Sequence, residues 1–182
     1  MYYFIKAYKD AYITENSPGH VVQFENHKYK NYGGDEILEL KKEFTNELST
    51  SPFGVSRMLC DFDLKKDLTP NLEVSGGLIP TASANYYLRY FEVEGQSERN
   101  QTYVLEATRV HQLAGGWSST TGWDEGVGKK FDNPKMRDGV TWVDHVSGSG
   151  WHKANSNLLS GSRSTPGGGV WLKPEAYVGN HA

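Results

Sequence analysis

The sequence predicts an all-β protein, an antiparallel β-sandwich of jelly-roll type with long Gly-, Ser- and Trp-rich loops. Three observations lead to this fold class. The apolar segments are short and are bounded by turn-forming residues. One segment alternates between apolar and polar residues, as a half-buried strand does. Stretches long enough for a helix are interrupted by Gly, Pro, Asn or Ser before two turns of apolar spacing accumulate.

The clearest predicted strand is SRMLCDFDL, residues 56–64. One face carries apolar residues, namely Met58, Cys60, Phe62 and Leu64. The other face carries Arg57, Asp61 and Asp63. Two carboxyl groups on one face can have the separation that glycosidases use. The nearby arginine favours a solvated surface or a cross-strand ion pair instead, so we assign no catalysis to this face.

Other short runs rich in Tyr, Phe, Val and Ile predict the remaining strands, over residues 2–7, 11–14, 85–94, 103–112, 139–145 and 169–173. Residues 35–48, DEILELKKEFTNEL, are ambiguous. Helical spacing is approximated by Ile37, Leu40, Phe44 and Leu48. A short strand over residues 36–42, followed by a polar loop, fits about as well, and we favour the strand.

The length of 182 residues fits one domain, which we expect to span residues 1–182. Residues 1–112 form a strand-rich part and residues 113–182 a loop-rich part, which holds all five tryptophans. The mean hydropathy is -0.63 and 13% of the residues are aromatic, so Tyr, Trp and Phe must supply much of the core. Long loops of this kind bind a partner or pack through their own side chains.

The composition excludes several function classes. A net charge of -3 and a pI near 6.1 lack the basic excess of a polyanion binder, so we do not expect nucleic acid as the main partner. The single Cys60 excludes an internal disulfide framework and, in its apolar run, is expected to be a small buried hydrophobe. No apolar run approaches the roughly 20 residues of a membrane span. The first residues lack the pattern of a signal peptide, so we expect synthesis in a cytoplasm and no membrane partner.

The segment TGWDEGVGKKFDNPKMRDGVTW, residues 121–142, is the best candidate for a ligand loop. A Walker phosphate loop is disfavoured because Lys130 stands where Ser or Thr is needed and no helix is predicted after it. A structural Ca²⁺ would draw on the oxygens of Asp124, Glu125, Asp132, Asn133 and Asp138. These residues lack the EF-hand order, and turn formation explains them better. We expect an ordered connection, turned by Gly126, Gly128 and Gly139, stiffened by Pro134 and tied to the sandwich at each end by Trp123 and Trp142.

Nucleophilic catalysis would draw on VDHVSGSGWH, residues 143–152, which contains Asp144, His145, Ser147 and Ser149. The run lacks the G-x-S-x-G elbow, so a Gly/Ser turn between strand ends is the favoured interpretation. The six histidines have no metal-ligand spacing. We therefore assign no catalytic, cofactor-binding or metal-ligating residue and expect no cofactor.

Three tryptophans in polar Gly/Ser surroundings are candidates for binding a protein partner or a glycan, namely Trp117, Trp123 and Trp151. Trp142 and Trp171 lie inside strand-like runs, and we expect them to pack loops onto the sandwich.

Five segments appear in an order that resembles the DNRLRE-type jelly-roll domain family: DAYIT (10–14), NYGGDEILEL (31–40), SRMLCDFDL (56–64), NYYLRYFEVEG (85–95) and TYVLEATRV (102–110). In that family a D-x-Y-I strand leads to an N-Y-G turn, and an Arg precedes an L-x-x-F-D-L strand. The matching residues are Asp10, Tyr12, Ile13, Asn31, Tyr32, Gly33, Arg57, Phe62, Asp63 and Leu64. The family usually closes its sandwich with further strands, so the resemblance implies either the N-terminal portion of a longer chain or a sandwich completed by other segments or chains. A strand edge left open in this way is a natural place for a partner to add a strand.

The later segment is similar to a variant associated with bacteriophage virion proteins, in which W-x-E-G-x-G leads through D-x-P to G-x-x-W. The matching residues are Trp123, Glu125, Gly126, Gly128, Asp132, Pro134, Gly139 and Trp142. This likeness implies a structural phage protein of the neck, collar, tail, baseplate or fibre, located in the virion and not an enzyme. Its implied partners are other virion proteins and copies of itself. The alternative is a carbohydrate- or cell-surface-binding jelly-roll module, and a glycan-processing enzyme is a weaker third.

Overall fold

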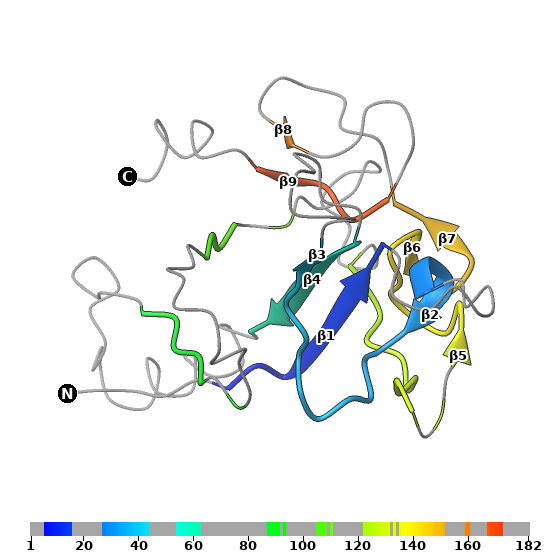
Figure 1. Ribbon diagram of the computed structural model, residues 1–182. Helices are drawn as coiled ribbons and strands as arrows, with labels where there is room; N and C mark the ends of the chain where they lie inside the picture. The colour runs from blue at the N-terminus through cyan, green and yellow to red at the C-terminus, as the bar shows by residue number, and fades with distance from the viewer. Residues whose placement is uncertain are drawn as a thin grey trace, which may run out of the picture. The chain divides into compact units, whose positions relative to one another are not determined.

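The computed structural model of the 182-residue chain describes residues 6–15, 27–43, 54–62, 87–91, 93, 105–108, 110, 122–131, 133, 135–151, 159–160 and 167–172. These residues are dominated by strands and loops, which confirms the predicted all-β class (Figure 1). Their strands are β1 (Lys9–Thr14), β2 (Lys30–Asn31), β3 (Lys42–Glu43), β4 (Gly54–Asp61), β5 (Lys135–Met136), β6 (Asp144–Val146), β7 (Ser149–Gly150), β8 (Leu159–Ser160) and β9 (Trp171–Leu172). One short 3-10 helix, η1 (His27–Tyr29), is the sole helical element in this described part.

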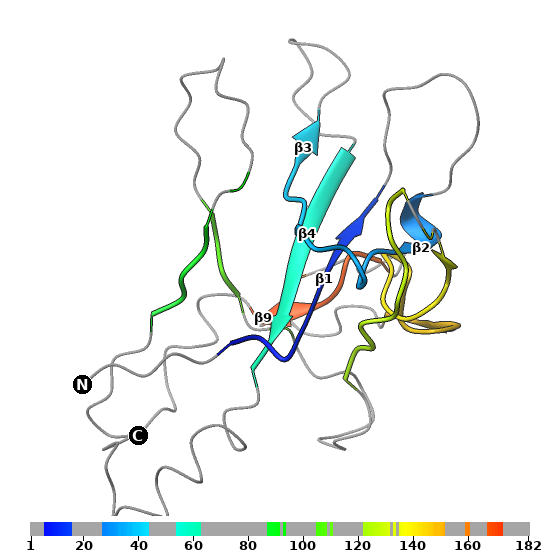
Figure 2. The ribbon, with the colours of Figure 1, turned by 90° about the horizontal axis from the view of Figure 1, so that it is seen from below.

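The main sheet contains three strands in the order β1-β4-β3 (Figure 2). The carbonyl of Val55 in β4 accepts a backbone hydrogen bond from Glu15, just after β1, at 3.0 Å. On the other side of β4, Val55 pairs with Lys42 of β3 in antiparallel register. The Ser56 N–H donates to the Lys41 carbonyl at 3.0 Å, which extends this pairing by one residue. The strand predicted over residues 11–14 is therefore confirmed. The strand predicted over residues 56–64 is confirmed as far as Asp61, whereas Phe62 adopts no strand.

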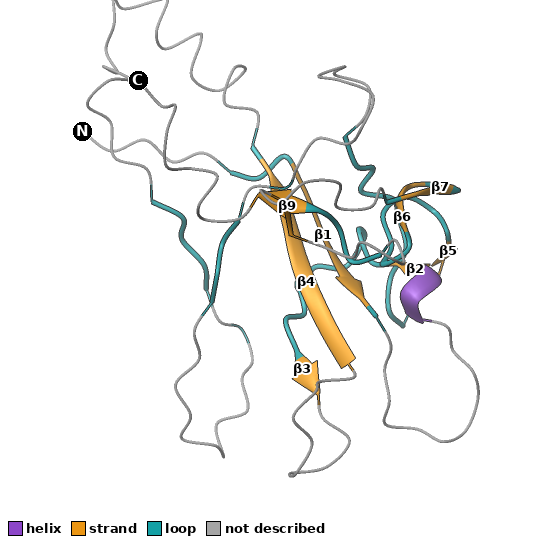
Figure 3. Ribbon diagram, turned by 90° about the horizontal axis from the view of Figure 1, so that it is seen from above, coloured by secondary structure: helices purple, strands orange, loops and turns teal. Residues whose placement is uncertain are grey.

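The other strands form short antiparallel pairs of two or three residues. Strand β2 pairs with β5 and β6 pairs with β7 (Figure 3). Strand β8 pairs with β9. Val110 adds an isolated bridge to Trp171. Pairs this short do not hold together by their ladders alone, so side-chain packing and loop hydrogen bonds must stabilise them. Residues 122–131 contain no strand.

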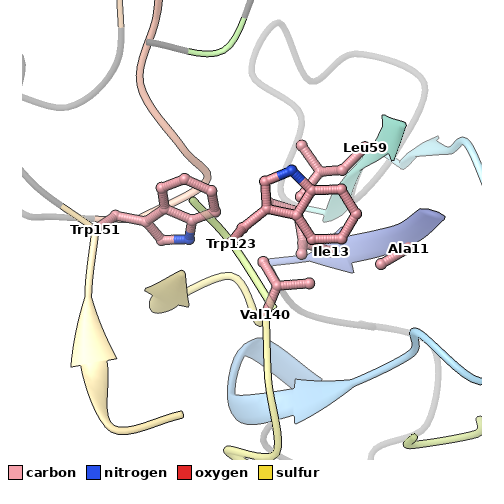
Figure 4. Packing of buried hydrophobic residues seen from close by; sticks show 6 residues of the cluster. All are labelled: Ala11, Ile13, Leu59, Trp123, Val140 and Trp151. Carbon is pink, nitrogen blue, oxygen red and sulfur yellow. The ribbon is translucent and has the colours of Figure 1, made fainter. Parts of the chain in front are cut away.

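The core combines the main sheet with side chains from the loop-rich part (Figure 4). Its buried apolar members are Ala11, Ile13, Leu59, Trp123, Val140 and Trp151. Two of the six are tryptophans, which bury more apolar area than any other side chain. The expectation that aromatic residues supply much of the core holds for this cluster.

The buried and exposed faces of strand β4 differ from the prediction. Leu59, on the face of Arg57, is 7% exposed and joins the core, whereas Met58 and Cys60 on the predicted apolar face are only half-buried. The prediction that the Met58 face alone is apolar is wrong, because the tryptophans of the loop-rich part pack on the other face. Leu64 lies outside the described residues.

Several predicted strands are shorter or missing within the described residues. Residues 87–91 and 105–108 adopt no strand, and in 36–42 only Lys42 enters one, so neither predicted strand nor helix forms over residues 36–41. The run 139–145 is a strand only from Asp144, and 169–173 only over β9. A strand needs a neighbouring strand to satisfy its backbone groups, and β-propensity alone does not provide one.

The chain divides into two compact units. The first comprises Met1–Lys9 and Cys60–Leu105, and the second comprises Asp10–Leu59 and Glu106–Ala182. The second unit takes residues from both the strand-rich and the loop-rich parts of the sequence. It contains the whole core cluster and most of the residues that the sequence analysis singled out.

Candidate functional site

Asn31 is the centre of the most extensively hydrogen-bonded region among the described residues of the second unit. Its side-chain amide donates to the carbonyls of Glu125 at 2.6 Å and Val140 at 2.8 Å. Its Oδ1 accepts from the backbone N–H groups of Gly33 at 3.2 Å and Gly128 at 2.8 Å. Asn31 is fully buried, and all four hydrogen-bonding positions of its amide are used. We call Asn31 with these four partners the Asn31 clamp.

Glycines allow the backbones of the Asn31 clamp to approach closely. A Cβ atom on Gly33 would overlap the Glu125 carbonyl, and one on Gly128 would overlap the Asn31 carbonyl. Gly126 has a φ of 75°, in the left-handed region that favours glycine. The predicted ordered connection is therefore confirmed here, although Gly128 serves close approach and has no positive φ. Pro134 lies outside the described residues.

Three aromatic rings lie next to the Asn31 clamp. Tyr12 and Tyr32 are stacked with centroids 4.5 Å apart and an interplanar angle of 14°. Nδ1 of His27 lies 2.6 Å from the Tyr32 hydroxyl. Burial, followed by the negative charges of Asp35 and Glu39, raises the pKa of Tyr12 far above its ordinary value. Tyr12 is therefore a neutral phenol that rigidifies the site and is no candidate for a proton-transfer role.

Lys130, the residue that resembled a phosphate-loop lysine, is already bound to carboxylates. Its Nζ lies 2.7 Å from Glu39 Oε2, and its backbone N–H donates to Asp35 Oδ1 at 3.1 Å. Lys41 forms a second ion pair with Glu39 at 3.3 Å. Burial raises the pKa of Glu39, but the hydrogen bond and charge of Lys130 and the charge of Lys41 outweigh it and hold the pKa below 4.5. This ion-pair group fastens the segment after Asn31 to the loop around Lys130.

The possible calcium ligands do not converge in the described residues. Glu125 Oε1 accepts the backbone N–H of Asp10 at 2.8 Å, and Asp138 accepts the N–H of Val127 at 3.3 Å. Asp124 is exposed, and Asp132 lies outside the described residues. In this part of the chain no group of three His, Cys, Asp or Glu side chains is arranged to hold a metal ion. The Glu125 contact shields a backbone donor of β1 instead.

The three tryptophans proposed as binding residues have different positions. Trp123 is 7% exposed and Trp151 is 2% exposed, both within the core cluster. The Trp151 Nε1–H also donates to the Thr141 carbonyl at 2.9 Å. Rings enclosed in this way do not offer a face for stacking on a sugar. Trp117 lies outside the described residues.

Trp142 and Trp171 are half-buried, and the sequence analysis expected them to pack loops onto the sandwich. Both rings contact a cation, the guanidinium of Arg57. Arg57 Cζ lies 4.8 Å from the Trp142 ring centroid and 4.3 Å from the Trp171 centroid. Arg57 Nη1 donates to the Gly168 carbonyl. Burial lowers the pKa of Arg57, an effect that the negative charge of Glu15 opposes. The arginine therefore ties β4 to the segment before β9 through cation–π contacts, a role that its predicted solvated face did not indicate.

In the first unit, Asp61 behaves as the sequence analysis expected. Its Oδ2 lies 3.4 Å from Lys9 Nζ, and it accepts the Tyr8 hydroxyl at 2.9 Å. This contact is the predicted ion pair between strands, here β1 and β4. Asp63, the second carboxyl considered for glycosidase chemistry, lies outside the described residues.

The β6–β7 hairpin brings a histidine and a serine together. His145 Nδ1 lies 2.9 Å from the Gly122 carbonyl, and His145 Nε2 lies 3.2 Å from the Ser149 hydroxyl. The predicted Gly/Ser turn is confirmed, since Ser147 and Gly148 connect the two strands. Sequence spacing did not reveal the pair, because residues four positions apart are distant in an extended strand, and these two meet because a turn folds one strand onto the other.

Asp144 and Ser147, the other two residues considered for nucleophilic catalysis, both lie near Arg137. The Ser147 hydroxyl donates to the Arg137 carbonyl. Asp144 Oδ2 is buried and lies 3.4 Å from Arg137 Nε, a distance at which the charges attract without a directed hydrogen bond. Asp144 is therefore not the residue that orients His145, and these four residues do not form a Ser-His-Asp triad.

Comparisons of the sequence with protein-family models and curated proteins, and of the structure with solved structures, found no match. Within the described residues, no helix has the length and apolar character needed to cross a membrane.

Proposed function

We propose that the chain is a structural component of a bacteriophage particle, in the neck, collar, tail, baseplate or fibre, and that it acts through protein–protein contacts. We propose with it that the strands belong to a jelly-roll sandwich of the DNRLRE type. The proposed role requires no catalysis and no cofactor. Its partners are other virion proteins and copies of itself.

The observation that carries this proposal is the Asn31 clamp. Asn31 and Gly33 bear the resemblance to the jelly-roll family, and Glu125 and Gly128 bear the resemblance to the phage variant. The Asn31 side chain bonds to Gly128, 97 positions away, and to the Glu125 carbonyl, 94 positions away. Two unrelated likenesses would give no reason for these segments to meet, whereas one domain type that contains both does.

Exposed apolar side chains give a second line of support. Tyr87 is 85% exposed, Phe91 74% and Val93 71%, all within one short segment of the first unit. Exposed apolar groups that are close together are typical of surfaces that contact other proteins. A repeated particle offers many such contacts for each copy.

The first test is the assembly state of the purified chain. Size-exclusion chromatography with light scattering, followed by negative-stain electron microscopy, should reveal a defined multimer with rotational symmetry. Mass spectrometry of particles purified from a lysate of the encoding phage should detect the chain. A strict monomer that is absent from such particles, or a chain encoded outside any phage genome, would overturn the proposal.

A glycan array on the same sample tests the carbohydrate-binding alternative. With Trp123 and Trp151 buried, a sugar platform would have to use other aromatic residues. We expect no glycan binding that competes with assembly of the chain. Specific glycan binding by a monomer would replace the assembly proposal with the alternative.

A further inference from the structure

We propose that Ser149 is a nucleophilic serine activated by His145 and that it reacts with activated carboxylic esters. This activity goes beyond the proposed structural function and does not rest on it. Four features of the hairpin carry it: the tautomer of the imidazole, the shape of the strand, the packing of the ring, and open space beside the serine.

The tautomer of His145 follows from its partners. The Gly122 carbonyl can only accept a hydrogen bond, so Nδ1, 2.9 Å away, carries the proton. A neutral imidazole has one N–H, which leaves a lone pair on Nε2. The Ser149 hydroxyl, 3.2 Å from Nε2, is placed to donate to that lone pair. This is the relation of nucleophile and general base, with a carbonyl orienting the ring in place of a carboxylate.

An irregularity in β6 directs the imidazole toward the serine. Asp144 pairs with Gly150 and Val146 pairs with Ser149, so the register shifts at His145. His145 is the extra residue of a bulge, and a bulge changes the direction of a side chain relative to a regular ladder. The shift occurs at the residue that serves as the base.

The ring of His145 is held in place, while Ser149 is accessible. His145 is 6% exposed, and its ring packs against Trp151 with centroids 5.9 Å apart at 52°. Ser149 is exposed. The neighbouring Gly148 has a φ of 72°, and a Cβ atom there would meet none of the described residues within 4 Å. An ester can therefore reach the hydroxyl from the side of the turn.

The proposed reaction has two balanced steps. In the first, the Ser149 Oγ–H proton passes to His145 Nε2, and Oγ forms a bond to the ester carbonyl carbon. The bond to the leaving oxygen breaks, and that oxygen takes the proton from Nε2 and leaves as an alcohol or phenol. In the second, water gives a proton to Nε2, attacks the acyl carbon and releases the acid while Oγ regains its proton. The sum is an ester plus water giving an acid plus an alcohol.

A fluorophosphonate probe tests the nucleophile directly. The P–F bond breaks, a P–O bond to Ser149 forms, and the serine proton leaves by way of His145 with fluoride. The full chain is incubated with the probe, and the modified residue is identified by peptide mass spectrometry. We expect modification at Ser149, and its loss in Ser149→Ala.

Two variants separate activation from exposure. Ser147→Ala removes the other serine of the same turn and should leave the labelling rate unchanged. His145→Asn keeps an amide donor for the Gly122 carbonyl but removes the base, and it should lower the rate at least about 100-fold. Near-ultraviolet circular dichroism checks that this variant retains its tryptophan packing.

Acetyl transfer from p-nitrophenyl acetate to Ser149, found by the same mass spectrometry, extends the test to esters. Labelling of Ser149 that depends on His145 supports the proposal. Labelling that is equal at Ser147 and Ser149, labelling unaffected by His145→Asn in a folded variant, or no labelling at all would each overturn it.

Discussion

The segments NYGG, residues 31–34 in the Asn31 clamp, and NYYLRYFEV, residues 85–93 around Phe91, begin with the same Asn-Tyr dipeptide but differ in burial wherever they are described. Asn31 and Tyr32 are buried and start NYGG, whereas NYYLRYFEV, residues 85–93, continues into side chains that are exposed wherever they are described. In the first case glycines admit a distant loop against the backbone. In the second, bulky side chains follow. The difference shows that the burial of a segment depends on what can pack against its backbone, more than on its own apolar content.

The largest expected effect comes from removing the centre of the Asn31 clamp. Asn31→Ala deletes four hydrogen bonds and leaves the Gly128 N–H and the Val140 carbonyl buried without this partner. We expect the free energy of unfolding to fall by about 4–6 kcal/mol, measured by urea denaturation. The matched control is Asn133→Ala, an exposed asparagine with one 3.4 Å contact to the Val127 carbonyl, expected to cost less than about 0.5 kcal/mol. Equal losses in the two variants would show that the clamp is not a centre of stability.

The next effect concerns the core beside the clamp. Trp151→Ala removes a large buried ring, and we expect a loss of about 3–5 kcal/mol. Trp151→Phe keeps much of the apolar contact but loses the hydrogen bond to the Thr141 carbonyl, so its loss should be clearly smaller. The same denaturation experiment distinguishes the two. A Trp151→Ala variant as stable as the parent chain would place the ring at the surface and reopen its role in glycan binding.

A smaller, pH-dependent effect comes from the ion pairs of Glu39. The folded-state pKa of this carboxyl is lowered, so its contribution is present above the ordinary value of 4.5 and is lost as pH falls through the folded-state value. Because the side chain is partly exposed, we expect Glu39→Gln to cost only about 0.5–1 kcal/mol at pH 7. Unfolding free energies between pH 7 and pH 3 should fall less steeply in the variant. The exposed Glu36→Gln serves as the control, and an unchanged pH slope in Glu39→Gln would contradict the assignment.

The smallest effect on stability is expected at the exposed segment. Phe91→Ser removes a side chain that is 74% exposed, so the free energy of unfolding should change by less than about 0.5 kcal/mol. If this segment contacts other copies, the same variant should weaken the multimer, as measured by light scattering over a dilution series. A large loss of monomer stability would show instead that Phe91 belongs to a core, and the comparison with the clamp would no longer hold.

The sequence allowed prediction of the elements whose signal is local. The alternation over residues 56–64 predicted a strand, which forms as far as Asp61, although it assigned the apolar face wrongly. The connection through Gly126 and Gly139 followed from residues suited to positive φ. The sequence did not predict which tryptophans lie in the core and which contact Arg57. Trp123 and Trp151 lie among Gly, Ser and acidic residues, yet they are buried because Ala11, Ile13 and Leu59 from distant strands cover them. Local polarity does not report on partners that are far away in the chain.

The same limit applies to the candidate sites. Asn31 was recognisable as part of a turn motif, but its four partners include residues 94, 97 and 109 positions away. Arg57 was expected at a solvated face, and its position between Trp142 and Trp171 depends on the segment before β9. The His145–Ser149 pair depends on a bulge, and no composition or spacing rule gives a bulge position from one sequence.

The long span of the Asn31 clamp also has a consequence for biosynthesis. Bringing ends about 100 residues apart into contact carries a large loop-closure entropy, and contacts of this separation are typical of slow folding. The clamp is not complete until Val140, 109 positions after Asn31, has left the ribosome. Until Glu125 has been synthesised, its carboxylate cannot accept the backbone N–H of Asp10. The edge of β1 is then open to pairing with another nascent chain. We therefore expect translation speed and chaperone supply to affect the yield of folded protein.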